Sequence, residues 1–261
     1  MARHSGGRSG GGAVPQRLIL PIRLEIVPET GSTNADLLAR LGAGEPAQEG
    51  LWLIANRQMA GRGRQGRAWL DGPGNFMGST AVLLLPQDPE PASLSVVTAL
   101  ALYETVFNHV GAPQSLELKW PNDLLLGGAK LAGILLERSG DIAVVGIGVN
   151  LNADPKLADR EAGSLSKVGP APDRNTFARD LAVNFDKELD RWRQFGLAPI
   201  FSRWLAAAHP FGTPLRVHAG DGEYVSGTFA GLGADGALLL RLEDGTVRVI
   251  HAGDVTIEGA P

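Results

Sequence analysis

Short apolar runs separated by polar segments follow one another along the first half of the chain, a pattern typical of strands in a sheet. The run LILPIRLEIV (18–27) predicts a first strand, and Pro21 within it suggests a sheet edge or a bulge. The segment 124–137 predicts a hairpin that turns at Gly127 and Gly128. The remaining strands of this part are expected at 51–55, 79–86, 115–120 and 141–151.

Other segments repeat their apolar residues close to helical spacing. This pattern predicts helices over 92–110, 175–194 and about 198–208. A short helix is expected to begin near the Ser-Thr-Asn run at 32–34, whose side chains can cap it, and to end at Gly42 or Gly44. Because strands predominate and do not alternate strictly with helices, the pattern predicts an α+β fold.

The pattern changes near Pro210. From Thr213 onward the apolar runs are short and are separated by turns that contain glycine, which predicts five short strands and a small barrel of SH3-like size. These strands are expected at 215–219, 223–232, 237–242, 246–250 and 254–258. We therefore expect a disordered tail at 1–16, a larger domain at 17–211 and a barrel domain at 212–261.

The composition is that of an ordinary globular protein and excludes several classes. The 261 residues carry a formal net charge of -4, which argues against a general nucleic-acid binder. The absence of cysteine excludes disulfides, thiolate metal sites and a cysteine nucleophile, and it suits a reducing cytoplasm. No apolar run approaches the roughly 20 residues that span a bilayer. The five histidines show no metal-ligand spacing, and no G-x-S-x-G or H-E-x-x-H motif occurs.

The stretch GRGRQG (61–66) matches two nucleotide-binding patterns by its glycine spacing alone. The dinucleotide pattern needs a helix that starts at the glycines, whereas RAWLDGPGNFMG follows here and cannot form one. The P-loop pattern needs Lys-Ser or Lys-Thr where Arg67 and Ala68 stand. What remains is a glycine loop with guanidinium groups that could bind an anion, although a solvated surface loop would have the same composition.

Two further features are candidates for chemistry. Asn122 and Asp123 follow Pro121 at the end of an apolar strand, where functional groups are commonly presented, although an Asx turn would explain them equally well. Lys130 enters a strongly apolar strand, so its ammonium group could be held near the core; taken alone, a surface lysine is the commoner case.

Four stretches together resemble biotin–protein ligases, in the order and with the gaps of that family. The resemblance covers about residues 25–260, and its stretches are GSTN (31–34), RQMAGRGRQGRAW (57–69), KWPNDLLL…KLAGILLE (119–137) and GIGVNLN (146–152). It implies a mixed central sheet with helices packed on it, of the class II aminoacyl-tRNA synthetase-like type, and a C-terminal SH3-like barrel. It also implies that ATP and biotin are substrates, used with Mg²⁺, and that biotinyl-5′-AMP then acylates a lysine of a biotin carboxyl carrier domain.

The resemblance implies roles for individual residues. It assigns the ureido head and ring of biotin to Ser32, Thr33, Asn34 and Gln58, and the acyl chain and carboxylate to the segment Arg62, Gly63 and Arg64. Lys130 would contact the carboxylate and the α-phosphate, and Lys130 and Arg64 would be the catalytic cations.

For the nucleotide, the resemblance implies that Arg64 and Arg67 hold the adenylate phosphate. Trp69 would pack on the adenine, while Asn122 and Asn150 contact the adenine or ribose. Three roles stay open for Asp123, namely a metal ligand for Mg²⁺, a ribose contact, or a group that orients the acceptor lysine.

Partners follow from the same resemblance. The carrier domain of a carboxylase is the expected partner, homodimers through the central sheet are possible, and we expect no nucleic-acid or membrane partner. Only 30 residues precede GSTN, whereas a DNA-binding domain needs roughly 50 or more, so we expect no repressor activity. A lipoate–protein ligase is the nearest alternative, although its RRxSGGG-type loop is missing. A non-enzymatic module that clamps an anion is the alternative from another class.

Overall fold

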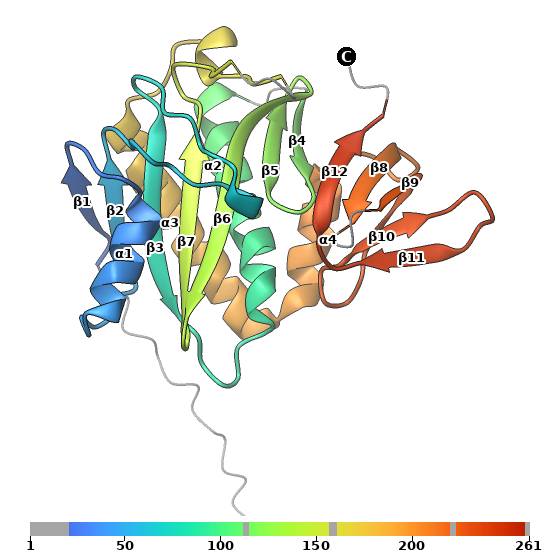
Figure 1. The fold of residues 1–261 in the computed structure, drawn as a ribbon, viewed down its shortest axis with the longest axis horizontal. Helices are drawn as coiled ribbons and strands as arrows, with labels where there is room; N and C mark the ends of the chain where they lie inside the picture. The colour runs from blue at the N-terminus through green and yellow to red at the C-terminus, as the bar shows by residue number, and fades with distance from the viewer. Residues whose placement is uncertain (1–20, 112–114, 157–160, 220–222, 259–261) are drawn as a thin grey trace, which may run out of the picture.

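The computed structural model describes residues 21–111, 115–156, 161–219 and 223–258. A large sheet with helices packed against it forms most of the molecule, and a smaller sheet lies beside it (Figure 1). The tail expected at 1–16 lies outside the described residues. Among the described helices, none combines the length and the apolar character that crossing a membrane requires.

The large sheet has seven strands in the order β1-β2-β3-β7-β6-β5-β4. β1 pairs with β2 in parallel and every other neighbouring pair is antiparallel, so the sheet is mixed, as expected. The strands are β1 (Arg23–Val27), β2 (Leu51–Ala55), β3 (Phe76–Leu83), β4 (Leu116–Lys119), β5 (Asp123–Leu126), β6 (Ala129–Ser139) and β7 (Ile142–Val149).

The sequence predicted most of these strands and placed the start of one wrongly. β1 lies at a sheet edge, as Pro21 suggested, and β5 and β6 form the expected hairpin through Gly127 and Gly128, both with positive φ. β3, however, begins at Phe76 rather than at Ser79. Pairing with β7 extends the strand back through Gly78, a residue that favours a loop when the local sequence is considered alone.

Two layers of helices cover the sheet. α1 (Thr33–Gly42) lies on one face, and α2 (Leu94–Val110) and α3 (Arg174–Phe195) pack on the other, followed by α4 (Leu197–Ala207) (Figure 1). β3 and β7 are buried along almost their whole length because both of their faces are covered. Of the three residues that could cap α1, Ser32 is the N-cap, and its hydroxyl accepts from the amide of Ala35.

The smaller sheet contains five antiparallel strands in the order β11-β10-β9-β8-β12. They are β8 (Pro214–Ala219), β9 (Tyr224–Leu232), β10 (Leu238–Arg241), β11 (Val247–Ile250) and β12 (Gly253–Ile257), as the sequence predicted. Among the described residues β11 and β12 do not pair with each other, so closure into an SH3-like barrel is not confirmed. The indole of Trp120 donates to the carbonyl of Gly236 at 3.1 Å and ties this sheet to the end of β4.

Candidate active site

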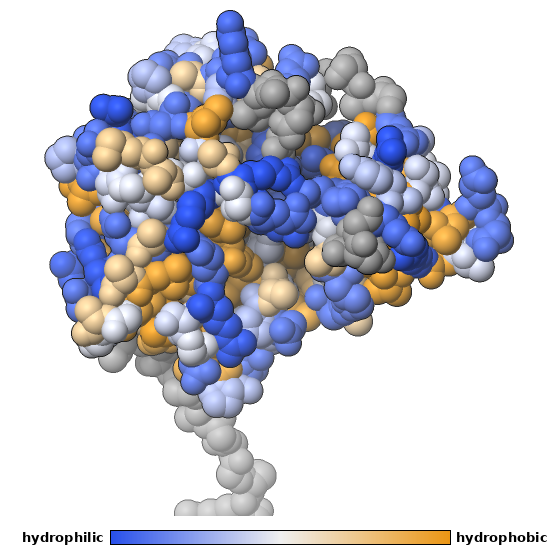
Figure 2. All heavy atoms as spheres, viewed as in Figure 1, coloured by the Kyte–Doolittle hydropathy of each residue, from blue (hydrophilic) through white to orange (hydrophobic). Residues whose placement is uncertain are grey.

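A cavity of about 470 Å³ lies between the α1 face of the large sheet, the loop at 61–69 and the edge of the smaller sheet. Figure 2 shows hydrophilic side chains gathered across the middle of this face, beside a hollow. Every site residue predicted from the sequence except Asn150 lines this cavity, namely Ser32, Thr33, Asn34, Gln58, Arg62, Gly63, Arg64, Arg67, Trp69, Asn122, Asp123 and Lys130.

Glycines make the floor of the cavity. Gly146 and Gly148 are two positions apart on β7 and therefore face the same side of the sheet. A Cβ added at Gly146 would lie 2.2 Å from Oδ1 of Asn34, and one added at Gly148 would lie 2.2 Å from Cε2 of Trp69. The glycines of the GIGVN stretch are needed because Asn34 and the Trp69 indole lie directly on the backbone of the sheet.

One end of the cavity is a closely hydrogen-bonded polar cluster. Oε1 of Gln58 accepts from the amide and the hydroxyl of Thr33 at 2.8 and 3.0 Å. The Thr33 hydroxyl lies 2.6 Å from that of Ser79, which donates in turn to Oδ1 of Asn34 at 2.6 Å. Such a network fixes which donors and acceptors face a ligand. Ser79, a fully buried residue in the middle of β3, was not among the predicted site residues.

The loop at 61–69, the arginine loop from here on, folds back on itself. The amide of Trp69 donates to the carbonyl of Gly61 at 2.9 Å, and that of Gly63 donates to the carbonyl of Arg67 at 2.7 Å. Between them Arg64–Gly66 makes a single 3-10 turn, with Gln65 at φ 55°. In the described chain the element after this turn is β3 and not a helix, so the loop is not a dinucleotide cradle, as predicted.

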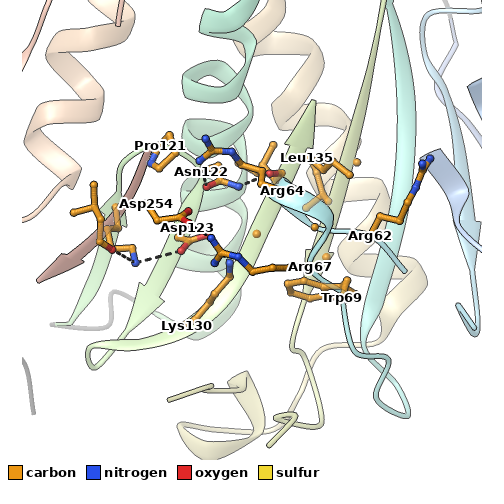
Figure 3. Close-up of a pocket in the computed structure, with 18 of the residues that line it drawn as sticks. Arg62, Arg64, Arg67, Trp69, Pro121, Asn122, Asp123, Lys130, Leu135 and Asp254 are labelled. Atoms are coloured by element: carbon orange, nitrogen blue, oxygen red, sulfur yellow. Dashed lines mark hydrogen bonds and ion pairs between the residues drawn. The ribbon is translucent and has the colours of Figure 1, made fainter. Parts of the chain in front are cut away.

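The three arginines of the loop point to different places (Figure 3). Arg62 is set apart from the other two and pairs with Glu137 at 3.4 Å, an acid that also accepts from Nδ2 of Asn34. Arg64 donates to Oδ1 of Asn122 at 3.3 Å and to the carbonyl of Gly253 at 3.4 Å. Arg67 pairs with the carboxylate of Asp254 on β12, so two of the arginines reach the smaller sheet.

Two lysines hold the carboxylate of Asp123, at the end of the cavity where Arg64 lies. Nζ of Lys130 donates to Oδ1 of Asp123 at 2.6 Å, and Nζ of Lys119 lies 3.4 Å from its Oδ2. Burial by itself would raise the pKa of Asp123, but the ammonium groups of Lys130 and Lys119 outweigh burial and hold that pKa below its usual range. Asp123 is therefore a buried carboxylate that stays ionised.

Arg64 is held in a desolvated position. Burial of its guanidinium lowers the pKa of Arg64 from the ordinary value, the nearby Asp123 opposes that change and Arg67 adds to it. An arginine remains protonated under all ordinary conditions. A partly desolvated, permanent charge of this kind interacts more strongly with an incoming anion than an exposed one.

Trp69 lies between the glycine floor and the cations. A Cβ at Gly133 would lie 3.3 Å from the Trp69 ring and 3.2 Å from Nζ of Lys130, so the ring and the ammonium group are neighbours. Among the described residues the buried indole Nε1 has no hydrogen-bond partner. An aromatic plane with an unsatisfied donor, beside a cation, suits a heteroaromatic ligand with acceptor atoms.

Asn150, the exception, lies behind the cavity wall. It is 1% exposed, and its Nδ2 donates to the carbonyl of Gly163 at 3.0 Å and to that of Lys130 at 3.4 Å. Its Oδ1 accepts from Nδ2 of Asn75 at 3.3 Å. In this structure Asn150 supports the backbone of Lys130, while its predicted contact with adenine or ribose stays a prediction.

The described residues offer no protein-built metal site. No group of three or more histidine, aspartate or glutamate side chains in that part of the chain could hold a metal ion. Both carboxylate oxygens of Asp123, the one candidate ligand, face ammonium groups. Mg²⁺ commonly binds through substrate phosphates with few protein ligands, so a Mg²⁺ that accompanies ATP would be held chiefly by the nucleotide.

The chain combines a mixed sheet with a cation-lined cavity that a second small sheet closes on one side, and comparison with known proteins identifies its class as a ligase. Residues 30–154 match the model of the biotin/lipoate A/B protein ligase family. Residues 212–257 match that of the biotin protein ligase C terminal domain. The chain belongs to the biotin/lipoate A/B protein ligase family, in its biotin protein ligase branch.

Three relatives are similar over most of the chain. The biotin--[acetyl-CoA-carboxylase] ligase of Paracoccus denitrificans is 40% identical over 90% of this chain and 100% of its own length. That of Mycobacterium tuberculosis is 36% identical, over 89% and 88%. The bifunctional ligase/repressor BirA of Escherichia coli is 35% identical over 90% of this chain, which matches 74% of BirA.

The fold is similar to that of a solved biotin protein ligase from Aquifex aeolicus, determined in complex with biotin and ATP. The TM-score is 0.79 at 24% identity, and the match covers 90% of this chain and 99% of that one.

Proposed function

We propose that this enzyme activates biotin with ATP and then biotinylates a lysine of a biotin carboxyl carrier domain. The observation that carries the proposal is the division of one cavity into two ends. Thr33, Asn34 and Gln58, whose side chains are neutral, form a hydrogen-bonded end, and Arg64, Arg67, Lys119 and Lys130 line the other. This division matches a substrate that has a neutral polar head and a carboxylate tail. The carboxylate would meet the nucleotide phosphate at the end that the cations line.

In the first step an oxygen of the biotin carboxylate attacks the α-phosphorus of ATP. The new P–O bond forms as the bond to the β-phosphate oxygen breaks, and pyrophosphate leaves with the electron pair. Two like charges about 4 Å apart repel by roughly 4 kcal/mol at an effective dielectric of 20. Arg64, Arg67 and Lys130 supply the positive charge that makes this approach accessible and that stabilises the developing transition state.

The biotinyl-adenylate must then be kept from water. A mixed anhydride hydrolyses readily, and sites that form one exclude water by covering it. The arginine loop lies at the cavity and carries Arg64 and Arg67. We propose that these two side chains exchange their contacts with Gly253 and Asp254 for the adenylate phosphate and so hold the loop over the intermediate.

In the second step the amine of the acceptor lysine attacks the acyl carbon, the C–O bond to the phosphate breaks and AMP leaves. Of the three roles open for Asp123, its contacts favour orientation of the acceptor lysine, since its carboxylate already accepts from ammonium groups. Asp123 can accept a hydrogen bond from the incoming ammonium group as well, and the proton that this group loses before the attack passes to solvent.

We propose biotin and not lipoate as the substrate because of the names of the relatives. The two most similar relatives described above are named biotin--[acetyl-CoA-carboxylase] ligases, so we propose the carrier domain of a carboxylase as the partner. Biotin-dependent exchange of labelled pyrophosphate into ATP, in the presence of Mg²⁺, tests the first step. Exchange with lipoate and none with biotin would contradict the proposal.

The organisation of the protein in the cell belongs to the same proposal. We propose a catalytic domain at 17–211 and a C-terminal domain at 212–261, with its strands closing into a barrel, in a cytoplasmic enzyme. Homodimers and a lack of repressor activity also stay predictions. Sedimentation of the protein with and without biotin and ATP tests the first, and a search for DNA binding under the same conditions tests the second.

A further inference from the structure

Lys119, the last residue of β4, has no role assigned by its sequence motif, yet it lines the cavity. Its side chain is 17% exposed, and its ammonium group makes two contacts. Nζ lies 3.4 Å from Oδ2 of Asp123 and donates to the carbonyl of Val255 on β12 at 3.0 Å. The first contact lies within the large sheet, and the second reaches the smaller one.

The fold fixes this arrangement. Lys119 and Asp123 are cross-strand partners in the hairpin of β4 and β5, so their side chains extend from the same face of the sheet. Lys130 stands on β6, next to β5, beside a register shift between Leu124 and Leu125. Three adjacent strands thus place one carboxylate between two ammonium groups, with Lys130 on Oδ1 and Lys119 on Oδ2.

We propose that Lys119 is a positioning residue for the adenylation step, which acts through Asp123 and anchors the smaller sheet to the catalytic cations. The inference rests on the proposed function. A carboxylate with one ammonium partner can rotate about its Cβ–Cγ bond, because terminal torsions of this type are broad. A second ammonium group on the opposite oxygen restricts that rotation, and so directs Oδ1, and Lys130 with it, toward the reacting phosphate.

The neighbouring residues of β12 support this anchoring. Gly253 accepts from Arg64, Asp254 pairs with Arg67 and Val255 accepts from Lys119, so consecutive residues of one strand each hold one cation of the site. A purely stabilising role explains the pair less well, since buried ion pairs often contribute little net stability. Figure 3 shows Asp123, Lys130 and Asp254 converging on the same part of the cavity.

The first test replaces the ammonium group. Lys119→Met is expected to lower kcat for biotin-dependent pyrophosphate exchange about tenfold with little change in KM for biotin, because the geometry of the catalytic cation is lost and the biotin end is untouched. Lys119→Arg, which keeps a cation for Asp123, is expected to recover most of that loss. Lys167→Met is the matched control, since Lys167 pairs with Asp154 outside the cavity and is 52% exposed.

The second test is a double-substitution cycle. If Lys119 acts through Asp123, adding Lys119→Met to Asp123→Asn costs no further activity, whereas independent effects multiply. Lys167→Met added to Asp123→Asn provides the independent comparison. Multiplied losses for Lys119 and Asp123, or a Lys119→Met enzyme within twofold of wild type, would overturn the inference. Should Lys119→Met fail to fold, Lys119→Gln, which keeps a donor without the charge, takes its place in the cycle.

These results separate the inference from the proposed function. Absence of biotin-dependent exchange in the wild-type protein contradicts the proposed function itself. Normal exchange in the wild type, with multiplied losses in the cycle, leaves the function standing and removes only the role of Lys119.

Discussion

Lys130 and Arg64 are the two cations whose loss should lower the rate of adenylation most. Replacing either with alanine removes a preorganised charge from the developing pentavalent phosphate, an effect that typically costs about 3–4 kcal/mol, or about 10²–10³ in rate. We expect pyrophosphate exchange to fall by that factor in Lys130→Ala and in Arg64→Ala. Arg138→Ala is the control, since Arg138 is 60% exposed and pairs with Asp141 at the far end of β6. Unchanged biotinyl transfer in both variants would mean that the site is misassigned.

The glycine floor gives a second prediction for single residues. In Gly148→Ala the new methyl group would lie 2.2 Å from Trp69, so the indole must leave the sheet. Overpacking of this kind typically costs about 1–3 kcal/mol, and here it should also weaken ATP binding. Thermal unfolding and nucleotide titration measure the two effects. Gly169→Ala, with nothing within 4 Å of its added Cβ, should change neither. Normal ATP binding by Gly148→Ala would show that the position of Trp69 is unimportant.

Some residues of the site could be predicted from the sequence and others could not. The arginines, Trp69 and Lys130 stand in distinctive motifs, so their meeting in one cavity was predictable. Ser79 and Asp254 were not, because a serine in an apolar strand and an aspartate at the start of a short strand are common everywhere. Their roles depend on which strands become neighbours, and this information is absent from local patterns. Asn150 stands in a motif as well, yet its side chain is engaged by buried backbone carbonyls.

At the scale of elements, the segment between α4 and β8 carries a titratable group in the core. His209 is 2% exposed and packs edge-on against Phe229 at 4.4 Å. Burial lowers the pKa of His209 to about 4, and the ammonium group of Lys119 adds to this change. The unfolded chain, whose histidine keeps a pKa near 6.5, therefore takes up a proton at a higher pH than the folded protein does.

This difference predicts how stability depends on pH. The contribution of His209 is fully present above about pH 6.5 and is lost as the pH falls through about 4, since protons then favour the unfolded state. Over this window the loss amounts to about 3 kcal/mol. Denaturant unfolding of the wild type and of His209→Phe at several pH values measures it. We expect a flatter pH dependence in the variant, and equal slopes would contradict the buried neutral histidine.

The elements themselves were predictable where the pattern was local. Helix caps, glycine turns and apolar periodicity predicted α1, the hairpin of β5 and β6 and the strands of the smaller sheet. The start of β3 was not predictable, because Phe76 to Gly78 become a strand through pairing with β7. The path of the arginine loop was missed for the same reason, since its arginines are directed by Glu137, Asn122 and Asp254, which are distant in the sequence.

At the scale of the whole molecule, the cavity joins two sheets that are separate in the sequence. His218, Tyr224 and the segment 254–257 line it together with the strands of the large sheet. A ligand that fills such a cavity stabilises both sheets against local unfolding. This stabilisation increases with the ratio of ligand concentration to Kd. The smaller sheet is thus expected to respond to ligands even though most predicted contacts lie elsewhere.

Hydrogen exchange measures this response. With biotin and ATP bound, the amides of β12 should exchange more slowly, because Asp254, Val255, Thr256 and Ile257 line the cavity. β11 is the internal control, since it lies at the opposite edge of the same sheet. Equal protection of both strands would point to a general stabilisation, and no protection of β12 would separate the smaller sheet from the site.

The central claim is that one cavity carries out both adenylation of biotin and its transfer to a carrier lysine. The most direct measurement is incubation of the enzyme with biotin, ATP, Mg²⁺ and a biotin carboxyl carrier domain, followed by mass spectrometry of the carrier. We expect the carrier to gain the mass of one biotinyl group at a single lysine, only when ATP is present. A carrier that stays unmodified with biotin, while lipoate is attached to a lipoyl domain under the same conditions, would contradict the claim.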